Sequence, residues 1–160
     1  MEHDQRYNCS HPLIMQLGKA SRTAWAAAAY RAAHQILEQG SIFADPLALR
    51  ILGQDAETVA REAKEHPSRQ RMRIFVAVRS RFAEDALVAA VERGVRQLVV
   101  LGAGLDTYAY RSTLGDRLHI FEGDHPATQA SKRQRLEYAA ITIPSSLNLR
   151  SRGLRTPDLG

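Results

Sequence analysis

The feature of this sequence that most constrains its fold is an apolar run that leads directly into a glycine-rich turn. The run extends from Leu98 to Leu101, and Gly102-Ala103-Gly104 follow without a break. A short apolar run that ends at a turn is typical of a buried strand in a parallel sheet. Glycine tolerates positive φ and, because it has no Cβ, lets the backbone approach another group closely. The pattern therefore predicts an α/β domain with a tight turn at the carboxyl end of this strand.

A second strand-like run, residues 118–124, follows the turn and ends in acidic residues. Its last residue, Asp124, lies 20 residues after Gly104. In nucleotide-binding α/β domains, an acid at about this spacing accepts hydrogen bonds from a ribose. Thr107 stands where the dinucleotide fingerprint has its third glycine, so that fingerprint is incomplete. We interpret the unit as the site of a nucleoside-containing cofactor, with a plain tight turn as the alternative.

Three acidic residues near the turn are candidates for ligand contact. Asp124 is favoured, because ligands of such sheets bind at the carboxyl ends of the strands. Glu122 lies two residues earlier, on the same face of the predicted strand, and is the second candidate. Its alternative role is that of an ion-paired or helix-capping acid. Asp106 directly follows the turn and either contacts a cofactor or caps a helix.

Most of the remaining sequence predicts helices. They cover residues 23–39, a short stretch that starts at Asp45-Pro46 and ends at Gly53, residues 70–93, and residues 126 to about 140. In the segment 70–93, apolar side chains that include Phe75, Val78 and Phe82 recur at three- and four-residue steps, so we expect this face to be buried. The order of helices, strand, turn, strand and helix predicts an N-terminal helical layer that precedes a parallel sheet.

Composition narrows the class of protein. The 160 residues, of which 44% are hydrophobic, predict one domain with a core. The sequence has no apolar run of membrane-spanning length and no secretory leader, so we expect a cytoplasmic protein without a membrane partner. Its single cysteine, Cys9, excludes an internal disulfide framework, and no His/Cys cluster predicts a metal site. Of the net charge of +5, residues 131–160 contribute +4 (six basic minus two acidic residues). These basic residues are split between a helix-like segment and a glycine- and proline-containing tail, which argues against nucleic-acid binding.

Seven segments carry a family resemblance that covers about residues 20–147. They read Leu101-Gly-Ala-Gly-Leu-Asp-Thr-Tyr-Ala-Tyr-Arg111, Phe121-Glu-Gly-Asp-His-Pro126, Lys132-Arg-Gln-Arg-Leu136, Ser21-Arg-Thr-Ala, Tyr30-Arg-Ala-Ala, Asp45-Pro-Leu-Ala and Arg79-Ser-Arg-Phe-Ala-Glu-Asp85. These segments closely resemble the leucine carboxyl methyltransferase family, and within it a bacterial branch of S-adenosylmethionine-dependent O-methyltransferases. The resemblance implies a class I methyltransferase (Rossmann-like) fold that binds S-adenosyl-L-methionine.

Residue matching to the family also implies a cofactor site. Arg81 would bind the carboxylate of the cofactor, the glycine turn its amino-acid and sugar portion, and Asp124 its ribose. The methyl acceptor would be a small molecule that offers a carboxyl or hydroxyl oxygen, and the sequence identifies no catalytic residue. The full set of predicted cofactor-binding residues is Arg81, Gly102, Ala103, Gly104, Asp106, Glu122 and Asp124.

The resemblance also divides the chain into three parts. We expect an irregular N-terminus over residues 1–20, and the helical layer with the first half of the methyltransferase domain over 21–147. Residues 148–160 lack both a β-branched apolar run and a helical period, so they are predicted to be an irregular, out-of-frame tail. Because family members are nearly twice as long, we expect the C-terminal half of the domain to be missing. A non-catalytic remnant and an NAD-type cofactor module are the alternative interpretations.

Overall fold

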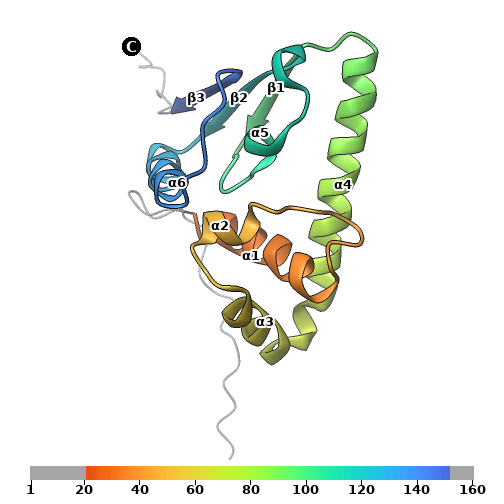
Figure 1. Ribbon diagram of the computed structural model, residues 1–160, viewed down its shortest axis with the longest axis vertical. Coiled ribbons are helices and arrows are strands. Elements are labelled where there is room, and N and C mark those ends of the chain that lie inside the picture. Colours follow the sequence, from red (N-terminus) through yellow and green to blue (C-terminus); the bar gives the residue numbers. More distant parts are fainter. Residues whose placement is uncertain (1–20, 152–160) are drawn as a thin grey trace, which may run out of the picture.

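The computed structural model describes residues 21–151, which form a mixed α/β fold with a small parallel sheet (Figure 1). The expected irregular N-terminus, with Cys9, and the last nine residues of the expected tail lie outside the described residues. The described elements, in chain order, are the helices α1 (Arg22–Leu37), α2 (Ala48–Leu52), α3 (Ala56–Glu65), η1 (Pro67–Arg69) and α4 (Gln70–Glu92), then β1 (Gln97–Leu101), α5 (Tyr108–Arg111), η2 (Gly115–Arg117), β2 (His119–Asp124), α6 (Pro126–Tyr138) and β3 (Leu147–Ser151).

The helices of the N-terminal layer begin and end at the residues that capping chemistry favours. Ser21 caps α1 by accepting a hydrogen bond from the Ala24 amide, and Asp55 caps α3 in the same way. Gly53 ends α2 with a φ of 66°, the left-handed conformation that glycine adopts without strain. Of the helices within residues 21–151, none combines the length and apolar character of a membrane span.

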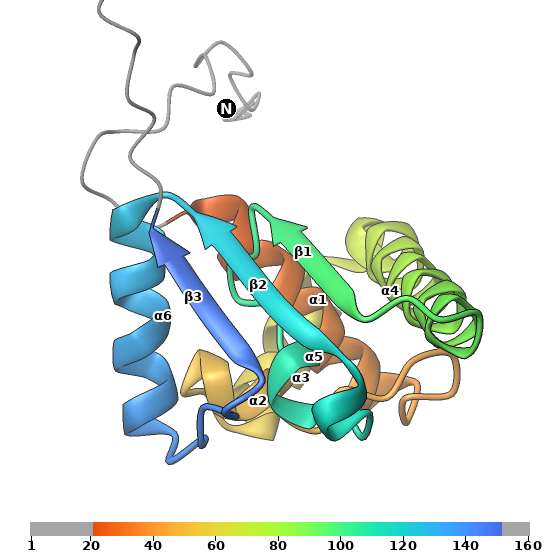
Figure 2. The same cartoon turned by 90° about the horizontal axis from the view of Figure 1, so that it is seen from above.

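The sheet contains three parallel strands in the order β1-β2-β3. Val99 of β1 pairs with Phe121 of β2, which in turn pairs with Asn148 of β3. In Figure 2 the sheet lies in front, with α1, α2, α3 and α5 behind it and α4 and α6 at its two sides. The described helices therefore leave one face of the sheet uncovered, and the exposed fractions agree: Val99 is 61% and Leu101 83% exposed on that face, whereas Ile120 is 2% exposed.

The start of the predicted tail is a strand, which corrects the expectation that residues from 148 onward are irregular. β3 runs from Leu147 to Ser151 and pairs with β2 along its length. Leu147 and Leu149 pack with Ile120 in the core beneath the sheet. The sequence hides this strand because Asn148 lies between the two leucines and no β-branched residue is present, so pairing with β2 rather than intrinsic propensity decides the conformation.

The face of α4 that was predicted to be buried is exposed in the structure, so that prediction was wrong. Phe75 is 57% and Phe82 74% exposed. The buried residues of the helix include Arg73, Val76 and Ala77, because α1 packs on that side. Helical periodicity identifies an apolar stripe but does not identify the element that covers it.

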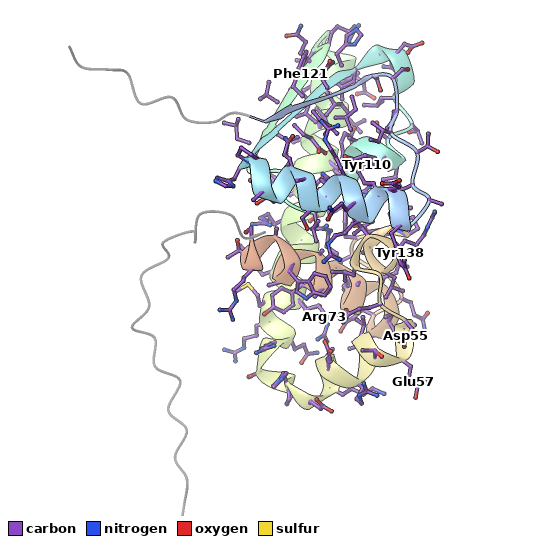
Figure 3. The ribbon with its side chains drawn as sticks, turned by 90° about the vertical axis from the view of Figure 1, so that its left-hand side faces the viewer. Asp55, Glu57, Arg73, Tyr110, Phe121 and Tyr138 are labelled. Atoms are coloured by element: carbon purple, nitrogen blue, oxygen red, sulfur yellow. The ribbon has the colours of Figure 1, made fainter. Side chains whose placement is uncertain are left out.

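The open edge of β1 generates a prediction about association. Within the described residues β1 has a hydrogen-bonded neighbour on one side only, and two of its exposed residues, Val99 and Leu101, are apolar. An edge of this kind is a template for pairing with another chain, and a lysine on it opposes pairing. We expect the purified chain to associate as its concentration rises and Val99→Lys to reduce this association, as measured by sedimentation velocity. Tyr138→Lys, which changes a more exposed aromatic side chain on α6 (Figure 3), should have no effect. A parent chain that stays monomeric throughout would contradict the prediction.

Candidate functional site

A cleft of about 750 Å³ lies at the carboxyl end of β1, between that strand, α1 and α4. The glycine turn forms part of its wall, α1 contributes residues from its first turns, and α4 contributes residues from its middle. Five of the seven predicted cofactor-binding residues line this cleft, and Arg81 and Glu122 do not. The residues that line the cleft include Ala24, Arg31, Arg79, Gly102, Gly104 and Asp124.

The glycine turn has the backbone conformation that glycine permits. Gly102 has a φ of 65° and Gly104 a φ of 53°. The Gly102 amide donates to the Gly123 carbonyl at 2.8 Å, so the turn remains joined to β2. A Cβ on Gly104 would lie 2.7 Å from the Ala24 Cβ of α1, whereas a Cβ on Gly102 would meet no described atom within 4 Å. Gly104 therefore permits close packing of α1, and Gly102 leaves space on the cleft side of the turn.

Asp124 lies at the end of β2 and faces the cleft. One carboxylate oxygen accepts a hydrogen bond from the Gly104 amide at 2.6 Å, and the other accepts from the His125 amide at 2.6 Å. A carboxylate has about four acceptor positions, so about two remain free for a ligand. The acid and the turn that the sequence separates by 20 residues are thus in direct contact.

The residues between the turn and α5 have local structural roles. Asp106 accepts a hydrogen bond at 2.8 Å from the amide of Tyr108, the first residue of α5, while its own amide donates to the Ala103 carbonyl at 2.8 Å. Asp106 and Ala103 both line the cleft. Of the two roles left open by the sequence, the helix N-cap falls to Thr107 and not to Asp106, whereas the position of Asp106 in the cleft wall allows a cofactor contact.

Glu122 points away from the cleft into the core, where it is 1% exposed. It forms an ion pair with Lys132 of α6 at 2.7 Å and accepts a hydrogen bond from the Tyr110 hydroxyl at 3.3 Å. Burial raises the pKa of Glu122 despite the Lys132 charge, and burial together with Glu122 raises the pKa of Tyr110. The structure therefore gives Glu122 the ion-paired role that was its alternative. Glu122 and Asp124, which were predicted to share a face of the strand, therefore have different surroundings: Glu122 lies in the core and Asp124 lines the cleft.

Arg81 lies outside the cleft, on the far side of α4. It forms an ion pair with Asp85 at 2.7 Å, and both side chains are 60% exposed. Arg79, two residues earlier, lines the cleft in its place. At about 100° per residue the two side chains are roughly 200° apart on the helix, so only one of them can face the turn. Arg81 was assigned by residue matching to the family, and the sequence alone does not show which of the two arginines faces the turn.

A second arginine in the cleft wall, Arg31 of α1, was also missed. It is 6% exposed and is held by Asp45 and by the Leu105 carbonyl. No local signal marks Arg31, because it lies in an alanine-rich helix and its partners are distant in sequence. Within residues 21–151 no three His, Cys, Asp or Glu side chains gather in a way that could hold a metal ion.

The parallel sheet, the glycine turn and the acid at the end of β2 define an α/β domain of the methyltransferase type. The chain belongs to the leucine carboxyl methyltransferase family, whose model matches residues 24–160. The match thus includes the segment predicted to be an out-of-frame tail.

Three bacterial relatives illustrate the similarity, each named "Putative S-adenosyl-L-methionine-dependent methyltransferase". YktD of Bacillus subtilis is 44% identical over 71 residues, which are 44% of this chain and 23% of that protein. The Mycolicibacterium gilvum protein is 42% identical over 80 residues, 47% of this chain and 26% of that protein. The Mycobacteroides abscessus protein is 37% identical over 108 residues, 61% of this chain and 36% of that protein. The matched part of the chain spans about a third or less of the length of these relatives.

The two glycines of the turn should respond differently to substitution. In Gly102→Ala, an alanine must adopt the left-handed backbone conformation, which costs about 1–2 kcal/mol, but its Cβ meets no described atom. Gly104→Ala adds a clash with Ala24, and overpacking of this kind costs a further ~1–3 kcal/mol. We therefore expect Gly104→Ala to lower the free energy of unfolding more than Gly102→Ala, as measured by urea denaturation.

A double-mutant cycle with Ala24→Gly isolates the clash. In that background the difference between the two alanine variants should shrink, because the methyl group that obstructs a Cβ at position 104 is gone. If both alanine variants lower the free energy of unfolding equally in the parent background, the close approach of α1 to the turn does not exclude a Cβ at position 104.

Proposed function

We propose that this chain carries the cofactor-binding part of an S-adenosyl-L-methionine-dependent O-methyltransferase. The observation that carries the proposal is the contact between the Asp124 carboxylate and the Gly104 amide at the edge of the cleft. It joins a ribose-binding type of acid to a glycine turn at the carboxyl ends of two adjacent parallel strands, where nucleotide cofactors bind in such sheets. The family match and the names of the relatives support the same cofactor.

The residues that line the cleft fit the parts of this cofactor. The free acceptor positions of Asp124 suit the two ribose hydroxyls. The open space in front of Gly102 suits a ligand that passes close to the backbone. Within the described residues, the guanidinium of Arg79 forms no ion pair or hydrogen bond, so it is free to meet a carboxylate. We therefore assign the carboxylate contact to Arg79 in place of Arg81.

The bound cofactor would supply a methyl group activated on a sulfonium, and the protein would hold an acceptor oxygen in line with it. A carboxylate acceptor needs no strong base, because it is already ionised near neutral pH. A hydroxyl acceptor would need one. We propose a carboxyl or hydroxyl oxygen on a small molecule as the acceptor; the family description, leucine carboxyl methyltransferase, supports the carboxyl alternative.

Calorimetric titration with S-adenosylhomocysteine tests the proposal. The parent chain should bind it, and Asp124→Asn should bind at least about tenfold more weakly, because a charged hydrogen-bond acceptor contributes roughly 1.5–3 kcal/mol. Asp116→Asn is the matched control, since Asp116 is exposed on η2 and lies outside the cleft. Thermal melts of each variant confirm that it is folded at the titration temperature. Absence of binding by the parent, or tighter binding of NADH, would contradict the proposal.

Arg79 and Arg81 form an internal matched pair on one helix. Arg79→Ala should weaken S-adenosylhomocysteine binding about tenfold or more, because the ligand carboxylate would lose its cation. Arg81→Ala should leave the affinity unchanged, because it removes only an exposed ion pair with Asp85. The reverse pattern would restore the assignment that the sequence resemblance implies.

A further inference from the structure

A buried carboxylate joins the helical layer to the loop that follows the glycine turn. Asp45, in the connection between α1 and α2, is 1% exposed. One of its oxygens accepts hydrogen bonds from Arg31 Nε at 2.8 Å and from the Thr107 hydroxyl at 2.7 Å. The other accepts from the Leu47 amide at 3.2 Å. The contact with Thr107 spans 62 residues of sequence.

Both ends of the loop formed by residues 105–107 depend on this carboxylate. Arg31, held by Asp45, donates through a second nitrogen to the Leu105 carbonyl at 2.7 Å. Thr107, at the other end, donates directly to Asp45. Its hydroxyl also accepts a hydrogen bond at 3.2 Å from Arg111, whose guanidinium forms an ion pair with Glu84 of α4. The loop is thus joined to α1, to α4 and to the connection before α2.

Position distinguishes this network from the residues that line the cleft. Leu105 and Asp106 line the cleft, whereas Asp45 and Thr107 do not. Thr107 is fully buried. Neither Asp45 nor Thr107 can therefore contact a ligand in the cleft. An effect of Asp45 on binding must pass through the loop backbone or through Arg31, which lines the cleft, whereas an effect of the Thr107 hydroxyl passes through the loop. A fully hydrogen-bonded buried network of this kind holds one geometry, because each alternative leaves a polar group unpaired.

We propose that Asp45 is a positioning residue that sets the shape of the 105–107 loop for cofactor binding. The part of the proposal that concerns binding rests on the proposed function, whereas the effect on the loop does not. Asp45 acts through Arg31 at Leu105 and through the hydroxyl of Thr107. Its loss frees both ends of the loop and lowers affinity for the cofactor without removing a group that touches it.

Two variants test the proposal at different severity. Asp45→Asn removes the charge that faces Arg31 and can lower the stability of the fold, because a buried guanidinium loses its partner. Thr107→Val is milder, since it retains the side-chain shape and removes only the hydroxyl. Thr107→Ser keeps the hydroxyl and should behave like the parent. Glu38→Gln is the control. It weakens the ion pair between Glu38 and Arg73 of α4, and neither of these two side chains bonds a residue of the loop.

Two readouts decide the outcome. Hydrogen exchange at the amides of Gly104, Asp106 and Tyr108 should be about tenfold faster in Thr107→Val and Asp45→Asn, and unchanged in Glu38→Gln and Thr107→Ser. S-adenosylhomocysteine affinity should fall about tenfold in the first two variants alone, at a temperature where all are folded. A tenfold change in exchange rate or in affinity corresponds to the loss of about one buried hydrogen bond.

The failures of the two proposals are distinguishable. Parent-like exchange in Thr107→Val, or an equal loss of loop protection in Glu38→Gln, would overturn the role of Asp45. If the parent chain does not bind S-adenosylhomocysteine, the proposed function fails, and exchange at the loop amides still decides whether Asp45 positions the loop.

Discussion

The close approach of α1 to the glycine turn is the constraint on which the cleft depends. Gly104 and Ala24 meet where a single additional carbon would lie 2.7 Å from its neighbour. Two small residues that lie 80 positions apart therefore set the distance between the helical layer and the sheet. With a larger residue at either position, the first turns of α1 could not form a wall of the cleft, and the turn would be open to solvent on that side.

Three acids in this region have different roles because their surroundings differ. Asp124 ends a strand, faces the cleft and keeps acceptor positions free. Glu122 is in the core, where Lys132 compensates its charge and burial raises its pKa. Asp45 is equally buried and joins segments that are far apart in sequence. A buried carboxylate is tolerated only where cations and hydrogen-bond donors surround it. Arg31 supplies the cation for Asp45, and Lys132 supplies it for Glu122.

Local sequence patterns predicted the individual elements well and their surroundings less well. Gly53 marks a helix end that the structure confirms. The apolar stripe of α4 was found, but Phe82 on it is exposed, because periodicity contains no information about which neighbour packs on a helix. β3 was missed altogether, because its pairing with β2 supplies what the propensities of its residues do not.

The sequence by itself determined the strand that ends in Gly102-Ala103-Gly104 and the acid 20 residues further on, because these depend on local backbone chemistry and on a fixed spacing. The resemblance carried by these residues was sufficient for the family, which the family model confirms. Only the tertiary structure decided that Arg79 rather than Arg81 faces the turn and that Asp45 reaches Thr107. Both depend on which helix face packs inward and on contacts between residues distant in sequence, and these follow from the packing of whole elements.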